Sequence, residues 1–224
     1  MTSATESAPQ ATDTGDMYAV HQVFRNAVAE APDLVGRVPD GDTARSALIA
    51  SYYDNVLRFL EVHHEGEDQL VTPRLLERCG DEESAVVRRV ADQHHEVVVV
   101  LADCDRALSA WKQSAGPSDS AAVLGALAAL GDRLVPHLDE EESEVLPIAA
   151  AHLSPAEWGE LPAHGMGGFT GDNLWLIVGL IQEQFTDEQR QKMLANMPPP
   201  VADAWRTSGQ NEFTTFVGEV RSTP

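Results

Sequence analysis

The chain has 224 residues, 43% of them hydrophobic, which is enough for one domain with a buried core and an appended region. Its 15 Lys and Arg against 36 Asp and Glu give a formal net charge of −21, which argues against nucleic acid or anionic lipid as a partner. Residues 1–15 are small and polar, without the parts of a signal peptide, and predict a disordered tail. The two cysteines form no metal or redox motif, so we expect a cytoplasmic protein.

Apolar residues at helical spacing predict four long helices separated by turn signals. In chain order they cover about residues 16–33, 43–80, 82–111 and 118–151, with "VGRVPDGD", "CG" and "SAGPSD" at the breaks. No segment shows sustained period-two alternation bounded by hairpin turns, so we expect no sheet. We therefore predict an all-α protein in which residues 16–152 form an antiparallel four-helix bundle.

The third and fourth segments each carry one stripe of positions that alternates in steps of three and four, as on the inner face of a bundle helix. The third stripe is Val87, Val90, His94, Val97, Leu101, Cys104, Leu108 and Trp111, and the fourth is Val123, Leu127, Leu130, Leu134, His137, Glu141, Val145 and Ile148. The run "VVVV" (97–100) favours a strand by propensity, but the stripe continues on both sides and predicts a helix. Pro136 predicts a local kink beside His137.

Residues 153–224 have a different pattern. The loops "GMGGFTGDN" and "NMPPPV" separate short helical stretches, and "SPAEW" has the spacing of a capping box. Because Trp158, Trp175 and Trp205 need burial, we predict a small helical C-terminal extension packed on the bundle. The longest apolar run, residues 174–181, is too short to cross a bilayer, so we expect no membrane association.

Histidine and glutamate interrupt the apolar stripes in a repeated pattern. The stretches "HHEGEDQLVTP" and "HLDEEESEVLP" both have His-x-x-x-Glu followed, six residues after the glutamate, by proline. His63 and Glu67, and likewise His137 and Glu141, are four residues apart and share one helix face. A further stripe histidine precedes each copy, His21 by 42 residues and His94 by 43. The chain therefore consists of two helical hairpins with the same polar residues.

Four imidazoles and two carboxylates on inner faces need a partner, because burying an unpaired carboxylate costs several kcal/mol. A pair of divalent cations provides one, and ligands from facing helices are a known arrangement in bundle cores. Nitrogen and oxygen donors without sulfur suit iron, with manganese or zinc less favoured. The predicted ligands are His21, His63, Glu67, His94, His137 and Glu141.

Residues 16–152 resemble the hemerythrin-like family, the HHE cation-binding bundle, on the basis of His21, "HHEGE", "DQHHE", "HLDEE" and the two distal prolines. The stretch "LSPAEWGELPAHGMGGF" also resembles extensions of actinobacterial members. The resemblance implies two iron ions with an oxo or hydroxo bridge. It further implies that Glu67 and Glu141 bridge the ions and that His21, His63, His94 and His137 are terminal ligands.

One departure from the oxygen-carrying members concerns the third helix. Those proteins have His-x-x-x-His there, whereas Val98 and Val99 stand four residues after His94 and His95. Reversible oxygen carriage is therefore in doubt, and solvent, His64, His95, Glu65 or His164 remain as further ligands. We expect His64 and His95, one step off the stripe, to face solvent or to lie outside the ligand shell. His152 and His164 are expected to be ordinary histidines.

The function predicted from these features is a non-haem di-iron protein that binds or reacts with hydrogen peroxide or dioxygen, with catalase- or peroxidase-like activity as one form. The alternative is a module that binds or senses oxygen, nitric oxide or iron without turnover. In a third, structural reading, internal salt bridges or one zinc ion satisfy the polar cluster. The oligomeric state is not indicated by the sequence.

Overall fold

The computed structural model describes residues 11–223, and every regular element in that range is a helix, as the all-α prediction requires. Residues 1–10 of the predicted disordered tail lie outside the described residues. Residues 11–15 are held against the protein, because Thr12 is buried and donates through its backbone N–H to Ala150 O (2.8 Å) and through its hydroxyl to Leu153 O (2.5 Å). Carbonyl groups near a helix C-terminus lack partners within the helix and accept such bonds readily.

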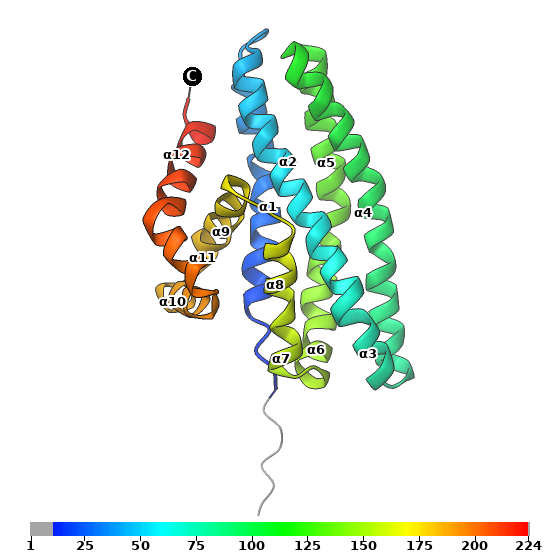
Figure 1. Cartoon of the computed structure of the whole chain (residues 1–224). Coiled ribbons are helices and arrows are strands. Elements are labelled where there is room, and N and C mark those ends of the chain that lie inside the picture. Colours follow the sequence, from blue (N-terminus) through cyan, green and yellow to red (C-terminus); the bar gives the residue numbers. More distant parts are fainter. Residues whose placement is uncertain (1–10, 224) are drawn as a thin grey trace, which may run out of the picture.

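Four long helical segments lie side by side (Figure 1). The first is α1, Asp16–Gly36; the second is α2, Thr43–Gly66, with the π-helical turn η1, Glu67–Val71, and α3, Thr72–Arg78; the third is α4, Asp81–Ser114; the fourth is α5, Pro117–Glu140, with the π-helical turn η2, Glu141–Val145, and α6, Leu146–His152. Connections of two to six residues join them, so consecutive segments run in opposite directions.

The contacts between these segments close a ring. Helix α1 packs against α2 and α5, and α4 packs against the same two helices from the other side. Local signals set the ends: the Asp42 side chain accepts a hydrogen bond from Arg45 N–H (2.9 Å) at the start of α2, and Ala115, in the left-handed conformation (φ 44°), reverses the chain between α4 and α5. The ring encloses a buried interior with two apolar clusters, a larger one that includes Phe24, Leu60 and Leu134 and a smaller one that includes Leu75, Val90 and Leu146.

The predicted stripes describe this interior well up to the π-helical turn. All eight predicted positions from Val87 to Trp111 are buried. In the fourth segment burial follows the prediction as far as Val145, but Ile148 is only half-buried and Ala149 lies inside instead. A π-helical turn takes one more residue than an α-helical turn, so the inner positions after η2 move by one residue. Helix α5 stays α-helical through Pro136, and the irregular turn begins only at Glu141.

The C-terminal region packs on the face formed by α1 and α2 (Figure 1). Its elements are α7, Pro155–Trp158; α8, Glu160–Gly167; α9, Asp172–Gln184; α10, Asp187–Asn196; α11, Pro199–Ala204; η3, Trp205–Gly209; and α12, Gln210–Arg221. Helix α9 adds Leu176, Ile177 and Leu180 to the main core. Trp158 and Trp205 are buried and Trp175 is half-buried. The region therefore shares part of its core with the four long segments, and Trp205 lies in a separate cluster with Val178, Met197 and Ala202.

One described helix, Pro117–His152, is long and apolar enough to cross a membrane by length and composition. This helix is the fourth long segment of the ring, and it packs against α4 and α1. A core helix of this kind passes the same test of length and composition as a membrane span, so the observation is weak support for membrane insertion.

Candidate metal centre

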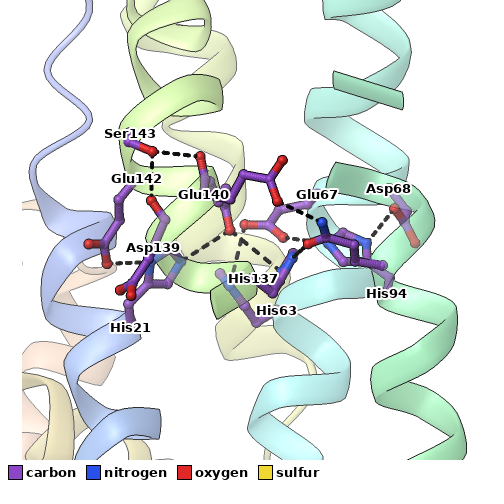
Figure 2. Close-up of polar contacts among 12 residues, drawn as sticks. His21, His63, Glu67, Asp68, His94, His137, Asp139, Glu140, Glu142 and Ser143 are labelled. Carbon is purple, nitrogen blue, oxygen red and sulfur yellow. Dashed lines mark hydrogen bonds and ion pairs between the residues drawn. The ribbon is translucent and has the colours of Figure 1, made fainter. Parts of the chain in front are cut away.

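The six predicted ligand residues lie at one level of the four long segments. The side chains of five of them point toward one another in Figure 2, and the sixth, Glu141, lies within 4 Å of His21 and His137. They are His21 of α1, His63 of α2, Glu67 of η1, His94 of α4, His137 of α5 and Glu141 of η2, referred to here as the His/Glu centre. All six are buried, with exposed fractions of 0–8%. The histidine stripe and the repeated His-x-x-x-Glu spacing thus converge in space.

Each glutamate of the His/Glu centre faces one imidazole from its own segment and one from another. Glu67 Oε1 lies 3.3 Å from His63 Nε2, and Glu67 Oε2 lies 3.5 Å from His94 Nε2. Glu141 Oε2 lies 3.4 Å from His21 Nε2 and 3.9 Å from His137 Nε2. These separations are longer than the about 2.8 Å of a charge-assisted hydrogen bond. They suit ligand atoms that share a metal at about 2.0–2.2 Å.

Several buried atoms at this point have no hydrogen-bond partner among the described residues. They are Nε2 of His21, His63 and His137, both carboxylate oxygens of Glu67, and Oε2 of Glu141. A buried polar atom without a partner costs about 1–3 kcal/mol, and a charged one costs more. Clusters of such atoms in a native interior call for a bound ion or water. The donor set of the His/Glu centre therefore fits metal cations.

Three of the imidazoles are held from outside through Nδ1. His21 Nδ1 lies 2.8 Å from Glu142 Oε1, and His94 Nδ1 lies 2.8 Å from Asp68 Oδ1. A carboxylate only accepts hydrogen bonds, so in both pairs the imidazole Nδ1–H donates and Nε2 keeps its lone pair. This is the tautomer that a metal ligand needs, and a carboxylate behind a ligand histidine is a common support.

His137 reaches the same tautomer through an amide. Its Nδ1 lies 2.9 Å from Gln93 Oε1, while Gln93 Nε2 donates to Glu140 Oε2 at 2.7 Å. Because the Gln93 amide nitrogen is engaged with a carboxylate, its oxygen must accept from His137 Nδ1–H. Arg89 donates to the other oxygen of Glu140 (2.6 Å), so a series of hydrogen bonds runs from Arg89 to His137. Hydrogen bonds from Gln93 and Arg89 lower the pKa of Glu140 and keep it an acceptor.

Each π-helical turn places two consecutive acidic residues, the first facing the His/Glu centre and the second bonded to a histidine of the opposite hairpin. In η1, Thr72 N–H donates to Glu67 O, five residues back. Pro73 comes next and lacks the N–H that a regular α-helix would use there. The resulting wide turn leaves Glu67 facing the centre and Asp68 bonded to His94. The turn η2 repeats this arrangement.

The two hairpins support each other across the molecule. Asp68, in the hairpin of the first and second segments, holds His94 of the other hairpin. Glu142, in the hairpin of the third and fourth segments, holds His21 of the first. Arg25 donates to Glu142 Oε1 at 2.7 Å. Burial opposes ionisation of Glu142, but the hydrogen bonds from His21 and Arg25 outweigh it and lower its pKa.

The interior sets the charge state of the cluster. Burial, with a smaller effect of the neighbouring imidazoles, lowers the pKa of His63 well below its usual value and that of His137 to about 3. Burial and the charge of Glu141 raise the pKa of Glu67 well above its usual value. Near neutral pH these two imidazoles are therefore neutral, which is the form that binds metal. A cation beside Glu67 would stabilise its ionised form, which neutral His63 does not.

His64 lies in the interior and does not face solvent, which was one of the two places expected for it. It is 3% exposed, and its ring stacks on that of His94 with centroids 4.1 Å apart. Neither ring nitrogen has a hydrogen-bond partner among the described residues. A ligand atom of His64 lies within 4.8 Å of one from His94 and one from His137, so a fifth imidazole is available. The inner face of α2 is wider than a one-residue stripe, which explains the difference.

The other residues left open as further ligands take different places. His95 and Glu65 are exposed. His164 of α8 is half-buried and packs on Gly66, where a Cβ atom would come within 3.1 Å of its ring. Gly66 therefore permits the close approach of α8 to the helix that carries His63 and Glu67. His152 lies far along the fourth segment, at the end of α6.

Protein-family models show to which family a chain with this arrangement belongs. The model of the hemerythrin HHE cation-binding domain matches residues 12–149, which contain all six residues of the His/Glu centre. The chain belongs to the hemerythrin HHE family. No curated protein and no solved structure gave a significant match. The match covers the four long segments except for the last three residues of α6, and the C-terminal region from Leu153 lies outside it.

Proposed function

We propose that this hemerythrin-domain protein holds two iron ions at the His/Glu centre and uses them on hydrogen peroxide or dioxygen. The observation that carries the proposal is the pair of buried glutamates, each facing imidazoles from two helices, with unpartnered nitrogen and oxygen atoms between them. The hemerythrin-type four-helix bundle is the scaffold that we infer from the ring of long segments and the family match.

The donor atoms separate into two sets that suit two ions. One set is His21 and His63 with Glu67 and Glu141, and the other is His64, His94 and His137. In the proposal Glu67 is shared, because its two oxygens face His63 and His94 separately. Imidazole and carboxylate without thiolate favour iron over the metals that prefer sulfur. When bound, two irons supply redox and Lewis-acid chemistry toward a small oxygen species.

The protein contributes a dry and rigid surrounding. Phe24, Leu60 and Leu134 are buried and lie three residues from His21, His63 and His137, in the next layer of the interior. This apolar layer limits water on one side of the centre, while Asp68, Gln93 and Glu142 fix the ring orientations on the outside. Fixed neutral imidazoles cost little reorganisation when an ion or a small ligand arrives.

The alternative is a binding or sensing role without turnover. The packing of α8 on α2 and η1, with His164 and Leu161 against Gly66, favours it as a second candidate because it connects the C-terminal region to the centre. In the structural alternative internal salt bridges satisfy the cluster. The N···O separations of 3.3–3.9 Å and the lowered pKa of His137 argue against that alternative.

Peroxide consumption by the iron-loaded chain tests the proposal. We expect the wild-type protein to consume hydrogen peroxide. The Glu67→Gln protein should lose both iron and activity, because glutamine has nearly the size of glutamate but lacks the negative charge of the proposed shared ligand. The matched control is Glu65→Gln, two residues away and exposed, which should keep both. A loaded protein whose visible spectrum responds to peroxide, oxygen or nitric oxide without consuming it would support the sensing role instead. Full activity in the Glu67→Gln protein would contradict both.

A further inference from the structure

A second cluster of metal-ligating side chains lies at one end of the hemerythrin domain. It consists of Cys79, the residue directly after α3, Glu83 in the first turn of α4, and His152, the last residue of α6. The sequence contains no motif that joins them, since 69 positions separate Glu83 from His152. The ends of α3 and α6 meet in space at the same end of the molecule as the start of α4 (Figure 1).

The ligand atoms of this cluster are close enough to share one ion. One atom from each of the three side chains lies within 4.8 Å of the other two. His152 Nε2 is 3.2 Å from Glu83 Oε2. Nitrogen and oxygen ligands at about 2.0–2.1 Å from a tetrahedral ion lie about 3.3 Å apart, so this separation needs little adjustment. All three residues are half-buried, so solvent could supply a fourth ligand.

Hydrogen bonds to main-chain carbonyl groups hold two of the three residues, Cys79 and His152, in place. Cys79 N–H donates to Leu75 O at 2.8 Å, and Arg78 Nη1 donates to His152 O at 2.8 Å. The guanidinium of Arg78 is otherwise engaged with Glu157, at 2.5 and 3.0 Å. Among the described residues the only ion-pair partner of Glu83 is His152, so its negative charge is available to a cation.

We propose that Cys79, Glu83 and His152 bind one zinc ion, at a site separate from the His/Glu centre. A thiolate, an imidazole and a carboxylate are a donor set that zinc accepts, and the thiolate distinguishes this site from the all-nitrogen and oxygen centre. Glu83 is eleven residues from His94, or about 16 Å along α4 at 1.5 Å per residue. The ion would join the α3–α4 turn to the end of α6 and so connect the two hairpins.

The charges around the thiol agree with a cation at this place. Burial and the negative charge of Glu83 raise the pKa of Cys79. A divalent cation between the two groups reverses the repulsion, so metal binding and loss of the thiol proton are coupled. Zinc binding would therefore release a proton and weaken as the pH falls.

Cobalt(II) titration of the full-length, reduced, metal-free protein tests the proposal, because thiolate-to-cobalt charge transfer in the near ultraviolet reports only a site that contains cysteine. We expect one such band in the wild type, displaced by zinc, and no band in Cys79→Ser. Glu83→Gln and His152→Ala should weaken cobalt binding at this band at least about tenfold. The matched control is Glu82→Gln, exposed and adjacent, which should titrate like the wild type.

A second measurement covers the case in which a variant folds poorly. In the wild-type protein zinc should protect Cys79 from a thiol reagent, while the buried Cys104 reacts slowly with or without zinc. Absence of the cobalt band in the wild type, a band that survives in Cys79→Ser, or unchanged affinity in both Glu83→Gln and His152→Ala would overturn the proposal. None of these results depends on what the His/Glu centre binds.

Discussion

The acidic residue that follows each glutamate of the His/Glu centre fixes the orientation of a histidine in the opposite hairpin. These residues are Asp68 and Glu142, and Asp68 is the more exposed. Its side chain is 46% exposed, yet it holds the buried His94 ring at 2.8 Å. We predict that Asp68→Ala lowers metal affinity about tenfold, the lower end of the range for such supporting carboxylates, because His94 loses its fixed tautomer.

Competition with a chelator measures the affinity of the Asp68→Ala protein. Glu65→Ala serves as the control, because Glu65 is exposed on the same part of the helix and points away from the rings. Equal affinities of Asp68→Ala and the wild type would show that His94 is oriented by packing alone.

A substitution of His64 tests whether its ring takes part in metal binding. If its ring completes the donor set of His94 and His137, His64→Leu should reduce the metal bound per chain or change the visible spectrum of the loaded protein. His95→Leu is the matched control, since His94 and His95 form the same dipeptide as His63 and His64 but His95 is exposed. Identical spectra and metal content in all three proteins would assign His64 to packing.

The sequence was sufficient to find residues on the inner stripes and insufficient for those beside them. His21, His63, His94 and His137 follow the apolar periodicity, and burial enforces that periodicity. His64 lies one residue off the stripe and is buried because the inner face of α2 is wider than the stripe. Asp68 and Gln93 are half-buried or exposed surface residues by pattern, and only the three-dimensional structure shows that they contact the rings of His94 and His137.

Among the helices, the two π-helical turns are the elements that shape the centre. Each begins at a glutamate of the centre and ends two residues before the motif proline. Four long helices were predicted from periodicity, and their bounds agree to within about three residues. The π-helical turns were not predicted, because the missing N–H of Pro147 indicates an interruption without specifying how the chain accommodates it.

Pro147→Ala tests the role of the turn η2. The restored N–H lets the helix return to regular α-helical bonds, which moves Glu141 and Glu142 out of register. We predict about tenfold weaker metal binding. The unfolding midpoint of the metal-free protein should be unchanged or higher, because alanine is the better helix former. Pro136→Ala is the control, since α5 is already α-helical there. Weaker binding in Pro136→Ala alone would contradict the role of η2.

For the molecule as a whole, the interior responds to pH through buried tyrosines away from the metal centre. Tyr52 and Tyr53 are 1% exposed, and Tyr53 donates to Ala27 O at 3.0 Å. Burial raises the pKa of both, with a further contribution to Tyr52 from the negative charge of Glu30. The folded state therefore keeps its protons where the unfolded chain loses them.

The free energy of unfolding should therefore fall as the pH rises above about 10, which is the tyrosine pKa of the unfolded chain. Each tyrosine should lower the free energy of unfolding by about 1.4 kcal/mol per pH unit in that range. Urea unfolding at a series of alkaline pH values measures the slope. The slope should be smaller in Tyr52→Phe, which lacks one ionisable group, although its stability at neutral pH can differ. Equal slopes would contradict the assignment.

The proposed function depends on cations at the point where the four long segments meet, since both hairpins bring buried imidazole nitrogens and carboxylate oxygens that lack hydrogen-bond partners among the described residues. Elemental analysis of the full-length protein, loaded with ferrous iron without oxygen and freed of excess metal, measures this most directly. We predict about two irons per chain, and a loss of that iron in Glu67→Gln combined with Glu141→Gln. A wild-type chain that binds no metal and keeps an unchanged fold in strong chelator would contradict the account.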